Sequence, residues 1–312
     1  MPRVRLAQLP TPLHAAPRLS DVLGVEVWLK RDDLTGVGLG GNKVRGLEFL
    51  LADALRQSCD VVVTGGAQQS NWAMLAALTA RMHGLDALLV HVGDSPAVAT
   101  GNQALAALAG AEVSFTGDDD RSAVDRAIDV ACAQLRAQGR RPYGMHRGGA
   151  DGVGALGYLT AGAELTMQLR DRGLAPSALW LATGSCGTQA GLVAAQAWQE
   201  WPFGGVGVTV SRPAPEAVAR VSDIAAATAV LAGTPTPSSP PRVVEGFLGP
   251  AKGHRSPEGD RAAELVARTE GVLLDPVFAA KAMAALVAQC RDGLVVAPVV
   301  FLVTGGAPTL FV

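Results

Sequence analysis

Short apolar runs alternate with helix-like segments along much of the chain. Apolar stretches of five or six residues bounded by glycine or polar residues are typical of strands buried on both faces. Segments such as 71–82 and 102–109 separate them and repeat apolar residues with helical spacing. This order predicts βαβ units, and therefore parallel sheets with helices on both faces. The predicted strands are 61–66, 87–92, 178–182, 206–210 and 299–303.

Three of these predicted strands end in glycine-rich polar turns, at 64–66, 183–185 and 304–306. In open parallel sheets, ligands bind outside the carboxyl ends of the strands. We therefore expect the three turns to line one cleft. The stretch 233–241 is rich in Pro, Thr and Ser, and patterned segments continue beyond it, so it predicts a surface loop and not a domain linker.

Composition narrows the class of protein. The 312 residues are 49% hydrophobic, yet no apolar run reaches the roughly 18 residues of a membrane span, so no membrane partner is expected. The 26 basic and 28 acidic residues are scattered without a basic stripe, which argues against a nucleic-acid partner. The five histidines show no metal-binding spacing. Four widely spaced cysteines and the lack of an apolar leader predict a cytoplasmic protein.

Lys43 follows the turn Gly40-Gly41-Asn42 and precedes an amphipathic stretch. A lysine amine attacks an aldehyde only when neutral, and partial burial lowers its pKa toward that state. The glycines would let the backbone approach a bound ring closely. An ordinary turn followed by a surface lysine is the alternative interpretation.

The segment 183–191 follows a predicted strand and opens a helix near Gln189. Its small residues expose backbone N–H groups, and Ser185 and Thr188 add hydroxyl donors next to the helix start. Together these groups suit a phosphate monoester. The Lys-Ser/Thr ending of a nucleotide P-loop is missing. A plain strand-to-helix turn is the alternative.

Two further polar positions complete the candidate chemistry. Ser70 and Asn71 stand at the start of a predicted helix, where they either cap it or bind an anion. Thr304 places a hydroxyl at the end of the last strand, unless this is an ordinary turn. A lysine, an anion site and a hydroxyl match the aldehyde, phosphate and ring nitrogen of pyridoxal phosphate. The combination therefore predicts pyridoxal 5'-phosphate as the cofactor.

The order of several motifs resembles that of a known enzyme family. The chain resembles the fold type II, tryptophan synthase β-like pyridoxal phosphate enzymes, and within them the family of 1-aminocyclopropane-1-carboxylate deaminase and D-cysteine desulfhydrase. The resemblance implies an α/β fold with two open twisted parallel-sheet domains and the cofactor in the cleft between them. The large domain would comprise 1–46 plus 151–312, with a small domain, 47–150, inserted in it; a homodimer is also implied. The motifs are Leu9-Pro10-Thr11-Pro12-Leu13, residues 29–34, Gly41-Asn42-Lys43, Gln69-Ser70-Asn71, residues 154–158, residues 184–191, Asp275-Pro276-Val277 and Thr304-Gly305-Gly306.

The resemblance also implies a role for each matching residue. Lys43 would bond covalently to the cofactor and move the substrate α-proton, and Ser70 would meet the substrate carboxylate and take part in catalysis. Asn71 would hydrogen-bond the phenolic oxygen of the cofactor. Thr304 would face the pyridine nitrogen, where a neutral hydroxyl favours elimination over transamination. Thr304 also favours membership of the desulfhydrase branch of the family, because the deaminase branch carries a leucine at this position. The implied cofactor-binding residues are Lys43, Asn42, Asn71, Thr183, Gly184, Ser185, Cys186, Gly187, Thr188 and Thr304.

The chain departs from the family pattern at three predicted substrate-binding positions. Phe278 and Lys252 replace two family tyrosines, and Trp72 replaces a His or Gln. Phenylalanine cannot exchange a proton, which places cyclopropane ring opening in doubt. Lys252 is either a proton donor, a partner for a second acidic group on the substrate, or a solvated lysine. The predicted substrate-binding residues are Ser70, Asn71, Trp72, Lys252 and Phe278.

The leading interpretation is a pyridoxal phosphate lyase acting on a small amino acid. It would remove the α-proton and eliminate a β-substituent, releasing pyruvate and ammonia as a D-cysteine desulfhydrase-like or deaminase-like enzyme. The first alternative is β-replacement or rearrangement on a specialised metabolite. The second, from another class, is a catalytically silent relative that binds pyridoxal phosphate or an amino acid, although a silent relative would not need Lys43.

Overall fold

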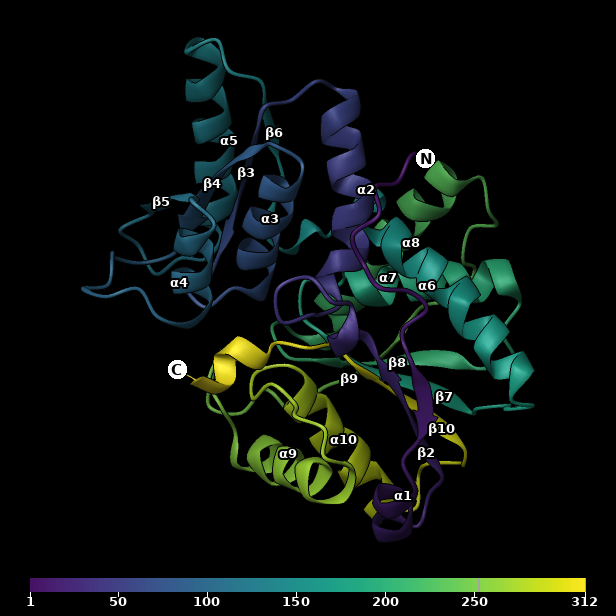
Figure 1. The fold of residues 1–312 in the computed structure, drawn as a ribbon. Coiled ribbons are helices and arrows are strands. Elements are labelled where there is room, and N and C mark those ends of the chain that lie inside the picture. Colours follow the sequence, from purple (N-terminus) through teal and green to yellow (C-terminus); the bar gives the residue numbers. More distant parts are fainter. Residues whose placement is uncertain (252, 312) are drawn as a thin grey trace.

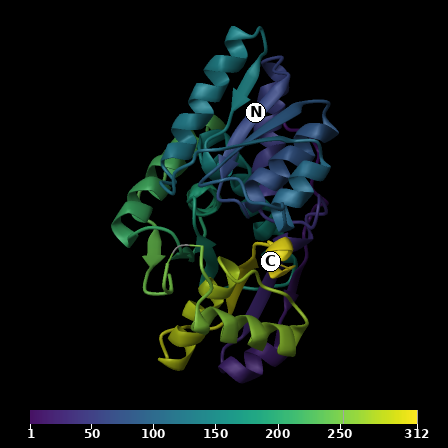
Figure 2. The same cartoon turned by 90° about the vertical axis from the view of Figure 1, so that its left-hand side faces the viewer.

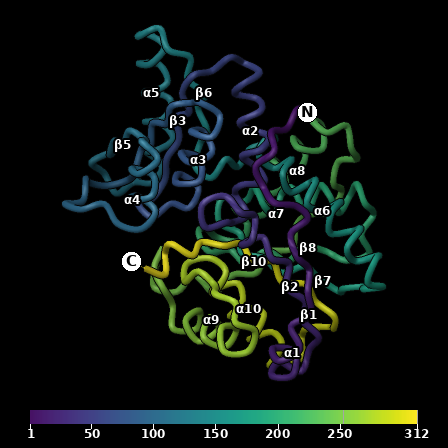
Figure 3. Tube along the Cα trace, in the orientation of Figure 1, coloured from purple at the N-terminus to yellow at the C-terminus, as the bar shows by residue number. Residues whose placement is uncertain are grey.

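The computed structural model describes residues 1–251 and 253–311. It contains two sheets with their covering helices (Figures 1 and 3). The larger sheet has the order β1-β2-β10-β7-β8-β9, and the smaller has the order β5-β4-β3-β6. The strands are β1 (Leu13–Ala15), β2 (Val27–Arg31), β3 (Val61–Gly66), β4 (Asp86–His91), β5 (Glu112–Phe115), β6 (Pro142–Gly144), β7 (Ala178–Thr183), β8 (Gly204–Thr209), β9 (Arg242–Val244) and β10 (Val299–Val303).

Ten α-helices among the described residues connect and cover these strands. They are α1 (Pro17–Leu23), α2 (Lys43–Arg56), α3 (Asn71–Met82), α4 (Gly101–Leu108), α5 (Ala123–Ala137), α6 (Gly152–Asp171), α7 (Gly187–Gln199), α8 (Ala214–Ala232), α9 (Pro257–Glu270) and α10 (Ala279–Arg291). None of these helices is both long and apolar enough to cross a membrane. A short 3-10 helix, η3 (Ala307–Phe311), follows β10 of the larger sheet and lies beside α4 (Figure 2).

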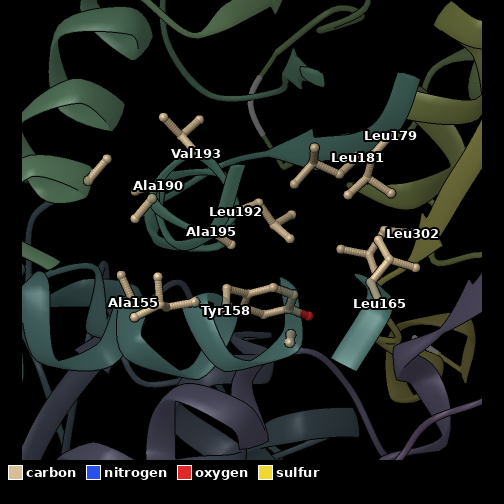
Figure 4. Close-up of a cluster of buried hydrophobic side chains, with 14 of the residues drawn as sticks. Ala155, Tyr158, Leu165, Leu179, Leu181, Ala190, Leu192, Val193, Ala195 and Leu302 are labelled. Carbon is tan, nitrogen blue, oxygen red and sulfur yellow. The ribbon is translucent and has the colours of Figure 1, made fainter. Parts of the chain in front are cut away.

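Alternating residues of the larger sheet supply two separate cores. Leu179 and Leu181 of β7 pack with α6, α7 and α8, and Figure 4 shows these leucines above Tyr158 of α6. Their neighbours Ala178 and Trp180 face the opposite layer, formed by α1, α9 and α10. The period of two residues follows from the strand geometry. A sheet that is apolar on both faces requires helices on both faces.

The smaller sheet follows the same rule with fewer elements. Val62 of β3 packs with residues of α2 and α3. Its neighbours Val61 and Val63 pack against Val124 and Ile128 of α5. All three pairings in this sheet are parallel. The carboxyl ends of its strands therefore lie along one edge.

The predicted α/β fold with parallel sheets is confirmed, and each predicted strand lies within two residues of an observed one. The larger sheet has one antiparallel pairing, between β1 and β2, which the sequence did not predict. The stretch 233–241 is a loop between α8 and β9, as expected. The division at residues 46 and 150 into a large and a small domain stays a prediction.

Candidate active site

Lys43 is the first residue of α2, and a buried ion network fixes this end of the helix. Arg45 donates hydrogen bonds to the carboxylates of Asp32 and Glu164 at distances between 2.8 and 3.0 Å. The helix also crosses α6 so closely that a Cβ atom on Gly157 would lie 2.3 Å from the backbone of Arg45. Only glycine permits this approach, and the crossing sets where Lys43 stands.

The Lys43 amine is partly buried, and its Nζ donates a hydrogen bond to Ser185 Oγ at 3.2 Å. Burial lowers the Lys43 pKa from 10.5 to about 8 and outweighs the smaller, opposing influence of Cys186. At pH 7.5, an amine with this pKa is about one-quarter neutral, compared with about 0.1% for an ordinary lysine. Lys43 therefore has the neutral amine that attack on an aldehyde requires.

The turn after β7 offers backbone N–H groups next to the Lys43 amine. Helix α7 begins at Gly187, two residues before the predicted start at Gln189, and no side chain caps it. The N–H groups of a first helical turn have no acceptor within the helix, so they and the helix dipole are available to an anion. The N-cap residue Cys186 has a φ of +81° and is buried. Burial raises the pKa of its thiol, which fits a packed residue and not a reactive one.

Asn42 joins three segments of the site. Its backbone N–H donates to the carbonyl oxygen of Thr304 at 2.9 Å. Its Nδ2 donates to Thr188 Oγ1, also at 2.9 Å. These two bonds hold the start of α2, the start of α7 and the end of β10 together. The Lys43 amine, the uncapped helix and the Thr304 side chain thus border the same space.

Ser70 and Asn71 face this space from the start of α3. Ser70 Oγ accepts a hydrogen bond from the backbone N–H of Ala73 at 3.2 Å, so the structural interpretation as an N-cap is confirmed. The cap uses a lone pair of the hydroxyl and leaves its O–H available to a ligand. Asn71 Nδ2 lies so near Gly306 that a Cβ atom there would be only 2.7 Å away. The two turns therefore meet closely at one wall of the cleft.

Asn102 of α4 holds residues 69–71 in place. No motif in the sequence pointed to Asn102. Its Nδ2 donates to Asn71 Oδ1 at 2.6 Å and to the carbonyl oxygen of Gln69 at 3.1 Å. Its backbone N–H donates to Gln69 Oε1 at 2.9 Å. Because Asn71 Oδ1 is occupied by this bond, the Asn71 amide nitrogen is fixed on the side of Gly306.

The three positions that depart from the family pattern differ in their placement. Trp72 borders the cleft but is only 4% exposed, and its Nε1 donates to Thr64 Oγ1 at 2.7 Å. Most of its indole packs in the core of the smaller sheet, which leaves little of it for a substrate. Phe278 is 37% exposed, and its ring lies against Gly184, where a Cβ atom would be 3.0 Å from Cε1. Lys252 lies outside the described residues.

A cleft of about 560 Å³ brings the predicted site residues together from both sheets. Gly187 is not part of its wall, because it packs against Ala150, where a Cβ atom on Gly187 would lie 3.2 Å from Cα. The predicted residues that line the cleft are Asn42, Lys43, Ser70, Asn71, Trp72, Thr183, Gly184, Ser185, Cys186, Thr188, Phe278 and Thr304.

Five arginines also line the cleft, and no motif pointed to them because they are isolated in different segments. They are Arg121, Arg147, Arg212, Arg220 and Arg255. Among the described residues, no tyrosine borders the cleft. Tyr143 donates its hydroxyl to Asp53, and Tyr158 is buried in the core with its hydroxyl bonded to Asp32, as expected for a packing residue.

Pyridoxal phosphate, which the resemblance implies, fits the residues present. The uncapped first turn of α7 suits a phosphate, and the neutral Lys43 amine suits an aldehyde carbon. The Thr304 side chain borders the same cleft and offers a hydroxyl to a ring nitrogen. The cleft volume is in the range of small-molecule sites in proteins.

Comparisons with known proteins agree with this fit. The family model described as "Pyridoxal-phosphate dependent enzyme" matches residues 4–305. The D-cysteine desulfhydrase of Yersinia pestis (strain Pestoides F) is 41% identical over 322 residues, covering 99% of this chain and 95% of the relative. The D-cysteine desulfhydrase of Salmonella choleraesuis (strain SC-B67) is 39% identical over 322 residues with the same coverage.

A solved structure extends the agreement to the fold. The structure described as "Crystal Structure Analysis of the ACC deaminase homologue" matches with a TM-score of 0.93 and 34% identity. The match covers 99% of this chain and 93% of that chain. The resemblance read from the motifs is thereby confirmed, and with it the pyridoxal phosphate cofactor. The chain belongs to the family of pyridoxal-phosphate dependent enzymes.

Proposed function

We propose that the protein is a lyase that acts on a small amino acid by α-proton removal and β-elimination and releases pyruvate and ammonia. The observation that carries this proposal is the Lys43 amine, whose pKa burial lowers to about 8 inside the cleft. The names of the D-cysteine desulfhydrase relatives support the reaction class. Bound pyridoxal phosphate supplies an electron sink for the negative charge left when the α-proton is removed.

Lys43 is proposed as the group that accepts the α-proton. A base works best when its pKa lies near the operating pH, and a value of about 8 meets this condition. Ser185 Oγ accepts a hydrogen bond from Nζ and so directs the amine. A protein that only bound the cofactor would not need a lysine amine whose pKa is lowered to about 8.

Ser70 and Asn71 are proposed to bind the substrate carboxylate. The free O–H of Ser70 and the Nδ2 group of Asn71 are neutral donors at the start of α3, where the helix dipole favours a negative charge. Asn102 would keep both donors aimed at the substrate, because it fixes residues 69–71.

The turn at 184–188 is proposed to hold the cofactor phosphate. Arg220 lies behind this turn, with its Nε 3.3 Å from the carbonyl oxygen of Ser185, and adds a positive charge there. Thr304 is proposed to face the ring nitrogen. Because a hydroxyl, unlike a carboxylate, does not keep that nitrogen protonated, it would limit electron withdrawal and favour elimination.

The lack of a phenol in the described part of the cleft favours β-elimination over cyclopropane ring opening. Phe278 offers no proton, so Lys43 and Ser70 are the proposed proton-carrying groups. The same observation supports β-replacement as a second candidate, in which another nucleophile takes the place of the departing group.

The organisation of the protein is also a proposal. We propose a large cofactor-binding domain of residues 1–46 plus 151–312, a small domain of residues 47–150 and a homodimer, all by analogy with the family. A cytoplasmic location is supported by the four cysteines, which are all free.

Assay of keto-acid formation tests the proposed function. Cofactor-loaded protein is supplied with D- and L-cysteine, β-chloroalanine and 1-aminocyclopropane-1-carboxylate, and pyruvate, 2-oxobutyrate and ammonia are measured. We expect pyruvate and ammonia in equal amounts from at least one β-substituted alanine, and neither from the Lys43→Ala variant. A coloured, cofactor-loaded protein that releases no keto acid would contradict the elimination. Consumption of the amino acid without pyruvate would favour β-replacement.

A further inference from the structure

Five arginines line the cleft, and they differ in the groups that they contact. Three of the five are neutralised by carboxylates within 3.2 Å: Arg147 by Asp125, Arg212 by Glu216 and Arg255 by Asp260. Arg220 lies against the proposed phosphate turn, where it donates to carbonyl oxygens of Ser185 and Ala150. Within the described part of the chain, Arg121 is the one of these five arginines that has neither a carboxylate partner nor a place beside the proposed phosphate turn.

Arg121 lies just before Ser122, the N-cap residue of α5, borders the cleft and is partly buried. Among the described residues, no carboxylate lies within 4 Å of its guanidinium, and its buried Nε has no hydrogen-bond partner. Burial, followed by the charge of the neighbouring Arg147, lowers the Arg121 pKa, but an arginine stays charged near neutral pH. Partial burial of a guanidinium that has no carboxylate partner is unfavourable, so the position is suited to an anion.

The side of the cleft formed by Arg121 and Arg147 lies close to the Lys43 amine. Arg147 is held rigidly, because Asp125 accepts hydrogen bonds from its backbone N–H, its Nε and its Nη2 at 2.7 to 2.9 Å. The next residue, Gly148, approaches the reactive lysine: a Cβ atom placed on it would lie 3.9 Å from Lys43 Nζ. A small molecule in contact with Lys43 can therefore extend toward this wall.

We propose that Arg121, beside Arg147, binds a second acidic group on the substrate. This inference rests on the proposed function and sharpens its substrate class: the enzyme takes amino acids whose side chain ends in a carboxylate or sulfonate. The carboxylate bound by Ser70 and Asn71 and the side-chain anion bound by Arg121 would then orient the α-carbon between them. Neutral amino acids of the same size would lack the second contact.

Matched acid and amide ligands test the charge preference directly. Cofactor-loaded protein is titrated by calorimetry with aspartate and asparagine, and with glutamate and glutamine, in both enantiomers. Each pair has nearly the same shape and differs in charge. We expect at least one acid to bind about tenfold more tightly than its amide, as a single charged contact of about 1.4 kcal/mol provides.

Two variants assign that preference to one residue. Arg121→Gln should remove the difference between acid and amide and leave the affinity for pyridoxal phosphate unchanged. Arg126→Gln is the matched control, because Arg126 lies nearby in α5 but is exposed, is paired with Asp120 and does not border the cleft. It should keep the wild-type preference.

Equal binding of acid and amide to the wild type, no binding of either, or a preference that survives in Arg121→Gln would overturn the subsite. Weaker uptake of pyridoxal phosphate by Arg121→Gln would also overturn it, because Arg121 would then serve the cofactor. Failure of the proposed function is recognised separately. It would appear as a cofactor-loaded wild type that releases no keto acid from any β-substituted alanine, whether or not it prefers the acid over the amide.

Discussion

Replacing Lys43 by methionine should stabilise the cofactor-free protein while it removes the reactive amine. Burial lowers the Lys43 pKa from 10.5 to about 8 in the folded protein, whereas the unfolded chain keeps the ordinary value. Between these two values, the unfolded state binds more protons than the folded state, so the wild type gains stability as the pH rises. Below about pH 8, the folded wild type carries the full cost of burying a charged amine.

The size of this cost follows from the two pKa values. A decrease from 10.5 to about 8 corresponds to about 3 kcal/mol, at about 1.4 kcal/mol for each tenfold change in proton affinity. Lys43→Met should therefore raise the free energy of unfolding by up to about 3 kcal/mol at pH 7. The gain should shrink to about 2 kcal/mol at pH 9 and about 1 kcal/mol at pH 10.

Urea denaturation of the cofactor-free proteins at pH 7, 9 and 10 measures this difference. Titration of other groups cancels between the wild type and the variant. Arg56→Met is a suitable control, because Arg56 is on the same helix but its side chain is 62% exposed. The reasoning is refuted if Lys43→Met brings no stabilisation at pH 7, or if the gain is the same at every pH.

Three further variants test the surroundings of the site. Arg220→Gln should weaken the binding of pyridoxal phosphate about tenfold but barely affect pyridoxal without its phosphate, as measured by absorbance titration; equal losses would exclude a phosphate contact. Asn102→Ala should weaken amino-acid binding without changing cofactor absorbance, and an unchanged substrate affinity would remove Asn102 from its positioning role. Arg45→Met should lower the free energy of unfolding by about 3–5 kcal/mol in urea denaturation, because it removes the cation paired with the buried Asp32 carboxylate and leaves Glu164 with Lys30 alone; a small loss would mean that the network is dispensable.

The length of an apolar run decided how well the sequence predicted each strand. The central strands β3, β4, β7, β8 and β10 are five or six residues long and apolar on both faces, so their pattern is clear. The strands β1, β6 and β9 have three residues each, too few for a period to be recognised. The antiparallel β1 lies at the edge of its sheet, and its place depends on pairing with β2 and not on its own pattern.

The site was predictable where neighbouring residues in the sequence carry the chemistry. Lys43 and the turn before α7 are local motifs, but the burial that lowers the Lys43 pKa depends on the surrounding fold. Arg121 and Asn102 reach the site from distant segments, so no local motif pointed to them. Trp72 adjoins Ser70 and Asn71 in the chain, yet the helix turns its indole into the core.

Borohydride reduction of the cofactor-loaded protein, followed by peptide mass spectrometry, tests the central claim most directly. The visible absorbance should be lost on reduction, and the mass of the reduced cofactor should appear on the peptide that contains Lys43. The Lys43→Ala variant should show neither change. Attachment to one of the chain's other lysines, or no attachment in a protein that holds the cofactor, would contradict the account.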